Sequence, residues 1–330
     1  MQDNSKLKLT VSVIIPTKNR PGDLDLTVQT LLQQSVLPEE LLIVDQSTDD
    51  ESSQRVHRLM DRYAPGSMQL KYVHDSRLSG GAAARNRAMA MATSEVWLFL
   101  DDDVCLEPNF VEELLAAYHS YPQAVGVSGI VTNYPRPAVA FQLWNRIFVC
   151  GPFRDDRQPV YWNAEQLRSS PPVRVSRLGA GLMSFRADAV RDIRFDENLS
   201  GVSDGEDVDF CSRIGGRLLI IVPQARLVHK LSPAGRSRQH WLNRHARSNH
   251  FLYRKNWSSK AINRASFAWL NAGYFLVAGF ASLRAASLTP WRDLMDGIRQ
   301  GHRAGLGTAD LKLERTAEAV EETSEETVNS

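Results

Sequence analysis

The sequence predicts a doubly wound α/β sheet, and three observations in its first part indicate that class. Short apolar runs rich in β-branched residues, typical of buried strands, alternate with longer segments that carry apolar residues at helical spacing. Each apolar run ends at a polar residue or a turn, as expected where a strand meets a loop. Four such runs occur before residue 101, and this alternation is typical of a parallel sheet with helices on both faces.

The expected elements follow one another along the chain. Strands are expected at residues 9–17, 41–45, 70–76 and 96–100. A helix is expected behind Pro21, because proline suits the first helical turn. A second helix is expected to open on Gly80 and Gly81, and a third to carry the apolar residues of 110–118 on one face.

The fourth strand, "VWLFL", ends on three consecutive aspartates, Asp101, Asp102 and Asp103. Adjacent carboxylates repel one another, so they need either water or a positive charge among them. A solvated turn is the simple explanation, because charge runs are usually exposed. Open α/β sheets, however, bind ligands beyond the carboxyl ends of their strands. Carboxylates are also hard ligands that hold Mg²⁺ or Mn²⁺ together with substrate phosphates, so the triplet is a candidate metal–diphosphate site.

Composition restricts the class of protein. A chain of 330 residues, 43% hydrophobic and 23% charged, can bury the core of one large domain or two smaller ones. With a net charge of +1 and no recognisable nucleic-acid motif, nucleic acid is not an expected partner. The three cysteines are widely spaced and suggest neither a disulfide framework nor a zinc site, which fits a reducing compartment. The first ten residues lack the apolar stretch of a signal peptide, so the catalytic part is expected in the cytosol.

An ordered series of segments resembles the family 2 glycosyltransferases, which are inverting sugar-transfer enzymes. The segments are "VSVIIPTKNR", "LLIVDQSTDD", "GGAAARNRAM", "FLDDDV", "GAGLMSFRADAV", "FDENL" and "GEDVDFCSR", followed by "LVHK". They cover Leu9 to Lys230. The resemblance implies the GT-A fold, a Rossmann-like mixed sheet that binds nucleotide-diphospho-sugars, here with a C-terminal helical extension.

The resemblance also implies a donor site and a metal site. The donor-binding residues would be Pro16, Thr17, Asn19, Arg20, Asp45, Arg85, Asn86, Asp101 and Asp102. A divalent metal, Mn or Mg, would be held by Asp103, Asp101 and His229. Simpler explanations remain open for three of these residues. Aspartate is common in turns, which would account for Asp45. The small residues beside Arg85 suit close packing, and a lone histidine such as His229 is usually structural.

In the second half, the resemblance makes Asp207 the general base, with Glu206 orienting the acceptor or supporting Asp207. The implied acceptor-binding residues are Gly179, Ala180, Gly181 and Asp204, and the implied diphosphate contacts from a mobile loop are Arg236 and Arg238. An ordinary helix start would also explain the carboxylates around Asp207, since acidic residues suit the positive end of the helix dipole.

The chain changes character after Lys230. We expect a GT-A catalytic domain at 1–230, with a nucleotide-binding half to about 125 and an acceptor half at 126–230, then a helical extension at 231–310 and an acidic disordered tail at 311–330. Residues 239–257 predict a basic amphipathic helix that lies on an anionic membrane or packs on the catalytic domain. Residues 265–283 carry no charge, and they predict an interfacial helix, a buried helix or a membrane span.

These inferences favour a metal-dependent glycosyltransferase that moves a sugar from a nucleoside diphosphate donor to a glycan or lipid-linked acceptor. The expected role is cell-surface polysaccharide or glycolipid synthesis, and the expected location is the cytoplasm, at the cytosolic face of the membrane. Two other classes remain open. One is a sugar-phosphate nucleotidyltransferase, and the other is a catalytically silent, membrane-associated scaffold of the same fold.

Overall fold

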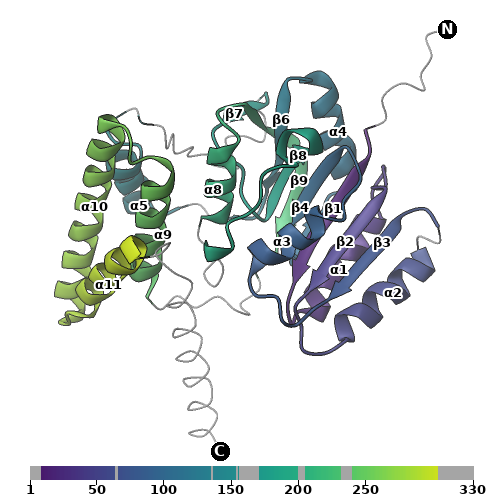
Figure 1. Cartoon of the computed structure of the whole chain (residues 1–330), viewed down its shortest axis with the longest axis horizontal. Coiled ribbons are helices and arrows are strands. Elements are labelled where there is room, and N and C mark those ends of the chain that lie inside the picture. The colour runs from purple at the N-terminus through teal and green to yellow at the C-terminus, as the bar shows by residue number, and fades with distance from the viewer. Residues whose placement is uncertain are drawn as a thin grey trace, which may run out of the picture.

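The computed structural model of the chain describes residues 9–63, 66–134, 137–153, 155, 171–199, 205–231 and 240–303. These residues form a sheet-based part and, beside it, a group of helices from the C-terminal part of the chain (Figure 1). The helix α9, at Trp241–Asn256, lies between the sheet-based part and the remaining C-terminal helices (Figure 1).

The half expected to bind the nucleotide contains the four expected strands. They are β1 (Val11–Thr17), β2 (Glu40–Asp45), β3 (Gln69–His74) and β4 (Val96–Leu100). All neighbouring pairs are parallel, in the order β3-β2-β1-β4. β1, β2 and β4 are buried along almost their whole length, because helices cover both faces of the sheet.

The sheet continues into the second half with five more strands among the described residues. They are β5 (Val104–Leu106), β6 (Ala124–Val131), β7 (Val173–Val175), β8 (Leu182–Arg186) and β9 (Leu218–His229). β8 lies antiparallel between β4 and β6, so the sheet is mixed, with the order β3-β2-β1-β4-β8-β6-β9-β5. The predicted mixed GT-A sheet is confirmed.

Helices cover the two faces of this sheet around separate cores. One face packs against α1 (Pro21–Leu32), α2 (Glu51–Tyr63) and α4 (Phe110–Ser120). The other packs against α3 (Gly81–Met89), α7 (Ala187–Val190) and α8 (Glu206–Arg213), with a short 3₁₀ turn at Glu197–Leu199 nearby. The alanines of α3 are buried against the sheet, so its small residues do serve close packing.

The helical group contains one segment that the sequence placed in the acceptor half. α5 (Val139–Trp144) and the π-helical turn η1 (Asn145–Val149) pack on α10 (Ala261–Ala285) instead of the sheet. The Trp144 and Tyr274 rings lie 5.4 Å apart, and Phe148 lies 5.4 Å from Trp269. α11 (Thr289–Arg303) completes the group and packs closely on α9.

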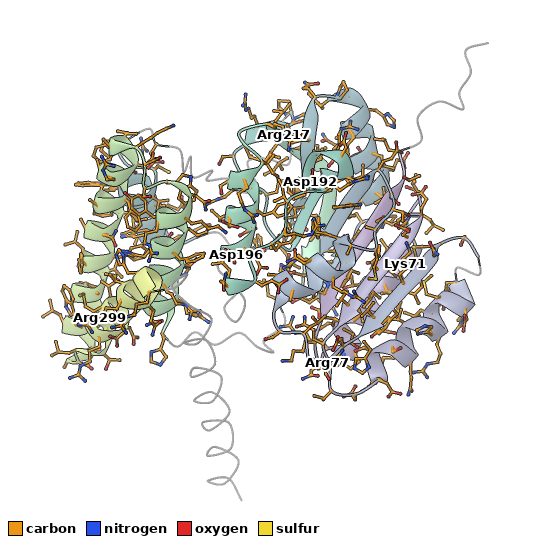
Figure 2. All side chains as sticks on the ribbon, in the orientation of Figure 1. Lys71, Arg77, Asp192, Asp196, Arg217 and Arg299 are labelled. Atoms are coloured by element: carbon orange, nitrogen blue, oxygen red, sulfur yellow. The ribbon has the colours of Figure 1, made fainter. Side chains whose placement is uncertain are left out.

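The basic helix α9 packs on the catalytic part. Lys255 Nζ lies 2.5 Å from Asp196 and 2.9 Å from Asp209, and both carboxylates belong to the sheet-based part. Asp196 lies at the side of that part that faces the helical group (Figure 2). Of the two alternatives for residues 239–257, the geometry therefore favours packing on the catalytic domain. Lys255 takes part in this packing through its ion pairs with Asp196 and Asp209.

Candidate active site

The carboxylates of the aspartate triplet at the end of β4 point to two sides, Asp102 toward Thr17 and Arg20, and Asp101 and Asp103 toward His229. Asp102 is buried and accepts hydrogen bonds from Thr17 Oγ1 at 2.7 Å and Arg20 Nη1 at 3.1 Å. Burial raises the pKa of Asp102 to about 6, although the bond from Thr17 and the charge of Arg20 oppose this rise. Thr27 Oγ1 also donates to the Asp102 carbonyl at 2.7 Å. Asp102 thus fixes the triplet to the end of β1.

Asp101 and Asp103 meet His229 on the other side of the triplet. Their ligand atoms all lie within 4.8 Å of one another, and His229 Nε2 lies 2.7 Å from Asp103 Oδ1. The sheet explains this contact across the chain, because the antiparallel pairing of β5 and β9 places Val104 opposite His229. Two carboxylates and an imidazole form a donor set that suits Mn²⁺, and the carboxylates alone suit Mg²⁺.

His229 is also oriented from its far side. Tyr134 Oη lies 3.1 Å from His229 Nδ1, and Asn133 exchanges hydrogen bonds with the His229 backbone at 2.7 and 2.9 Å. A histidine that binds a metal through one ring nitrogen usually donates from the other, and this partner fixes the ring. Tyr134 can accept that hydrogen bond. Both the metal-facing side of His229 and its far side therefore fit the role of a metal ligand.

The turn at Gly179–Gly181 connects the metal cluster to the predicted base. The Asp101 backbone N–H donates to the Gly181 carbonyl at 3.3 Å, and a side chain at Gly181 would collide with the Asp101 carboxylate. One residue earlier, the Ala180 N–H donates to Asp207 Oδ2 at 3.3 Å. The same short turn therefore holds one metal-cluster carboxylate and the candidate base.

Glu206 and Arg85 form a buried ion pair beside this turn. Arg85 Nη1 donates to Glu206, and Arg85 Nη2 lies 3.4 Å from Asp101 Oδ1. Burial raises the pKa of Glu206, and the charge of Arg85 opposes the rise. Because the Glu206 side chain is buried against Arg85, its position fits support of the neighbouring Asp207 better than direct orientation of an acceptor.

The remaining predicted donor residues lie at the same edge of the sheet but are engaged with the protein. The buried Asp45 accepts from the Ser47 N–H at 2.8 Å and from Tyr72 Oη at 2.6 Å. The Asn19 N–H donates to Ser47 Oγ at 2.7 Å, which ties the loops after β1 and β2 together. Pro16 lies within β1, one residue before its end.

Asn86 does not join this group. Its side chain exchanges hydrogen bonds with the Phe195 backbone at 2.8 and 2.9 Å and donates to Glu197 at 2.9 Å. Asn86 thus joins α3 to the 195–197 segment, and its expected contact with the donor stays a prediction. Three further predicted residues, Asp204, Arg236 and Arg238, lie outside the described residues.

Sequence reasoning missed the residues that hold the site in shape. They are Thr27, Ser47, Tyr72 and Tyr134. Thr27 and Tyr72 carried a usable signal, because a threonine inside an apolar helix face and a tyrosine in a short strand each need a polar partner when buried. Tyr134 follows β6 in a polar turn, where the sequence gave no indication of His229 as its partner.

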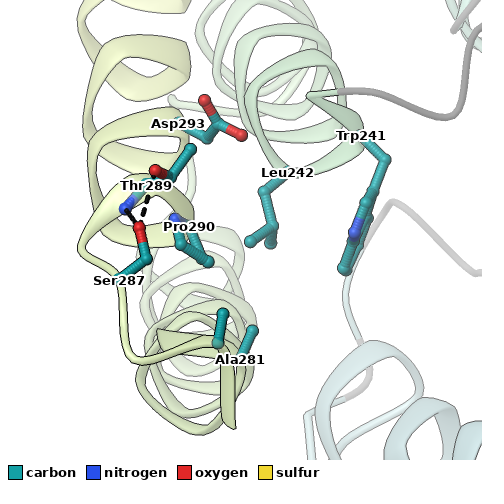
Figure 3. Close-up of a pocket in the computed structure, with 8 residues that line it drawn as sticks. Trp241, Leu242, Ala281, Ser287, Thr289, Pro290 and Asp293 are labelled. Carbon is teal, nitrogen blue, oxygen red and sulfur yellow. Dashed lines mark hydrogen bonds between the residues drawn. The ribbon is translucent and has the colours of Figure 1, made fainter. Parts of the chain in front are cut away.

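A hollow of about 370 Å³ lies among α9, α10 and α11 of the helical group. Figure 3 shows residues that line it. Trp241, Leu242 and Pro290 contribute to its mostly apolar lining. The one carboxylate in this lining belongs to Asp293, whose Oδ1 lies 2.8 Å from His240 Nδ1. This hollow lacks the clustered carboxylates of the strand ends, so it is not the candidate sugar-transfer site.

The mixed sheet, the aspartate triplet at its strand end and the nearby Asp207 carboxylate define a GT-A nucleotide-sugar transferase architecture. Residues 12–185 match the family described as "Glycosyl transferase family 2", and the chain belongs to that family. The predicted family and fold are thereby confirmed.

Two curated relatives illustrate the sequence similarity. The validoxylamine A glucosyltransferase of Streptomyces hygroscopicus subsp. limoneus is 34% identical over 127 residues, which cover 38% of this chain and 27% of that protein. The pre-mycofactocin glycosyltransferase of Mycobacterium tuberculosis (strain CDC 1551 / Oshkosh) is 27% identical over 224 residues, 66% of this chain and 42% of that protein. The matched region thus spans less than half the length of either relative.

Two solved structures illustrate the similarity in fold. S. aureus TarS in complex with UDP-GlcNAc has a TM-score of 0.58 at 17% identity, over 90% of this chain and 81% of that chain. The mannosyltransferase PcManGT from Pyrobaculum calidifontis, in complex with GDP-Man and Mn2+, has a TM-score of 0.55 at 18% identity, over 96% and 81%. At these identities the likeness concerns the fold.

Proposed function

We propose that the protein is a metal-dependent, inverting glycosyltransferase that uses a nucleoside diphosphate sugar as its donor. The observation that carries this proposal is the turn at Gly179–Gly181, which contacts Asp101 of the candidate metal cluster and Asp207 at once. This turn thereby positions two carboxylates relative to each other. Asp101 would serve the leaving diphosphate through the metal, and Asp207 would serve the incoming hydroxyl.

The chain's own residues divide the chemistry between them. Asp207 takes the proton of the acceptor hydroxyl while that oxygen attacks the anomeric carbon and the bond to the diphosphate breaks. A single displacement of this kind inverts the configuration at that carbon. The Arg85–Glu206 pair holds the start of α8 against α3, and the Ala180 N–H donates to Asp207, so the orientation of the Asp207 carboxylate is fixed.

Asp101, Asp103 and His229 would hold the metal ion, Mn²⁺ or Mg²⁺. When bound, such an ion neutralises the negative charge that the leaving diphosphate acquires. The structurally similar PcManGT in complex with GDP-Man and Mn2+, and TarS in complex with UDP-GlcNAc, support this choice of donor class and metal.

The acceptor is proposed to be a glycan or a lipid-linked glycan, in a cell-surface polysaccharide or glycolipid pathway. The reaction is proposed to take place in the cytoplasm at the cytosolic face of the membrane. Helix α10 supports this location through its apolar surface. Within the described residues it is the one helix that is long and apolar enough to cross a bilayer by length and composition, although its polar contacts to α9, described below, argue against a crossing.

Two matched variants test the proposal, after a thermal-shift panel of nucleotide sugars with Mn²⁺ has identified the donor. Asp207→Asn is expected to bind the donor normally and to lose turnover by on the order of a hundredfold or more. Asp103→Asn is expected to lose the thermal shift that Mn²⁺ adds to the donor. Asp192→Asn, at an exposed position on the sheet-based part (Figure 2), serves as the control.

Three outcomes would contradict the proposal. Near-normal turnover in Asp207→Asn would assign the base to another residue, and an unchanged metal response in Asp103→Asn would remove the metal assignment. Release of inorganic pyrophosphate instead of nucleoside diphosphate would indicate a nucleotidyltransferase.

A further inference from the structure

Helix α10 presents a continuous apolar stripe to solvent. The exposed side chains are Ile262, Trp269, Leu276, Phe280 and Leu283, between 38% and 82% exposed. Their spacings of seven, seven, four and three residues place them on one side of the helix, since a helix repeats every 3.6 residues. From first to last the stripe is about 32 Å long, at 1.5 Å per residue.

A second apolar segment lies beside this stripe. In α5 and η1, the exposed apolar side chains are Val139, Phe141, Leu143 and Ile147, between 40% and 81% exposed. Trp269 of the stripe donates from Nε1 to the Ile147 carbonyl at 2.7 Å, and Phe148 packs where a side chain at Gly273 would otherwise be. Figure 1 shows α5 next to α10. We call these nine exposed side chains the apolar face.

The charged residues of the segments that carry the apolar face are all basic. Residues 137–150 and 261–286 contain no aspartate or glutamate, whereas Arg146, Arg264 and Arg284 are exposed there. A second copy of the chain would bring these arginines toward equal charges, which is unfavourable. A bilayer that contains anionic lipids offers both an apolar layer and negative headgroups, and each signal alone gives only marginal attachment.

The opposite side of α10 argues against a helix that crosses the bilayer. Asn271 Oδ1 lies 2.8 Å from His250 Nε2, and Asn249 donates to Tyr274 Oη at 2.9 Å, so polar groups join α10 to α9. A crossing helix would have to break these contacts or carry α9 and its charges into the hydrocarbon, where unpaired polar groups are costly.

We propose that the apolar face, formed jointly by α5, η1 and α10, docks on the surface of an anionic bilayer with α10 lying along the membrane. The partner of α10 in this contact is the 139–149 segment, and the basic helix α9 holds α10 to the catalytic part from the other side. The proposal deepens and rests on the membrane-proximal location proposed above, but it does not depend on the transfer chemistry.

Vesicle co-sedimentation of the full chain tests the proposal. We expect binding to vesicles of phosphatidylcholine with phosphatidylserine and much weaker binding to phosphatidylcholine alone. The double variants Val139→Ser/Phe141→Ser and Phe280→Ser/Leu283→Ser should each lower the partition coefficient by about tenfold or more, because two apolar side chains no longer enter the interface. Arg146→Gln should lower it by about fivefold on the anionic vesicles only.

Tyr63→Ser, at an exposed aromatic on α2, is the matched control and should bind vesicles as the unchanged protein does. If the 139/141 variant binds normally while the 280/283 variant does not, the 139–149 segment is not part of the contact and the proposal is wrong. Absence of vesicle binding by the unchanged protein, or a dimer in light scattering that the 280/283 variant abolishes, would also overturn it. Donor hydrolysis is measured in parallel: its loss with normal vesicle binding would count against the proposed function instead.

Discussion

Replacement of Gly181 by alanine should slow catalysis while leaving the protein folded. An added Cβ would lie 3.0 Å from the Asp101 Cγ and closer still to Oδ2, whereas non-bonded heavy atoms settle at about 3.5 Å. The Asp101 carboxylate must therefore move by a distance on the order of 1 Å, and a displacement of that size costs about a hundredfold in rate. The overpacking itself should cost about 1–3 kcal/mol of unfolding free energy.

The assay is release of nucleoside diphosphate from the donor, measured against Mn²⁺ concentration. Gly181→Ala should show a reduced maximal rate and should need more Mn²⁺, because Asp101 belongs to the candidate metal cluster. Gly179→Ala is the matched control: a Cβ there meets no atom within 4 Å, and its unfolding free energy should stay within about 0.5 kcal/mol of the unchanged protein. Equal losses in both variants would refute the reasoning, since the effect would then come from the turn and not from Asp101.

Two further predictions concern stability. Burial raises the pKa of the Glu40 carboxyl, but the bond from Lys71 and neighbouring donors outweigh it and lower that pKa from 4.5 to about 2. The stabilisation is thus fully present above pH 4.5 and is lost as the pH falls toward 2, so Glu40→Gln should lose up to about 3 kcal/mol in urea unfolding at pH 7 and nearly nothing at pH 2. Glu51→Gln, in an exposed pair, should lose less than about 0.5 kcal/mol at either pH, and a pH-independent Glu40 effect would contradict the argument. Lys255→Met should lose about 2 kcal/mol in the same experiment, because it removes a charged partner of the buried Asp209; an unchanged midpoint would show that this contact does not stabilise the protein.

Local patterns predicted the first half of the fold because each strand and its polar end lie within one short stretch of sequence. β8 was not predicted, since a five-residue strand inserted antiparallel between β4 and β6 is defined by its neighbours and not by its own pattern. The helical turn at 139–149 was missed for a related reason: its apolar residues face outward as well as inward, so no helical stripe identifies which side is buried.

The candidate site was predictable only in part. The sequence placed the three carboxylates together at the end of a strand, but it did not indicate that Asp102 would be buried against Thr17 and Arg20. The contact between Asp103 and His229 does not follow from any local pattern, because it depends on the pairing of β5 with β9 across 126 positions of the chain. His229 was proposed as a ligand from the family resemblance, and the pairing supplies the physical reason for its position.

Helix α9 has a consequence for the choice of acceptor. It contacts α8 on one side and α10 and α11 on the other, and Lys255 pins it to Asp196 and Asp209. Because α9 fixes the helical group to the sheet-based part, the candidate active site would lie at a fixed distance from any surface that the apolar face contacts. The length of the linker would then select among acceptors attached to that surface. A linker that is too short cannot bring the acceptor hydroxyl to the active site, and one that is too long lowers the effective concentration of the hydroxyl there.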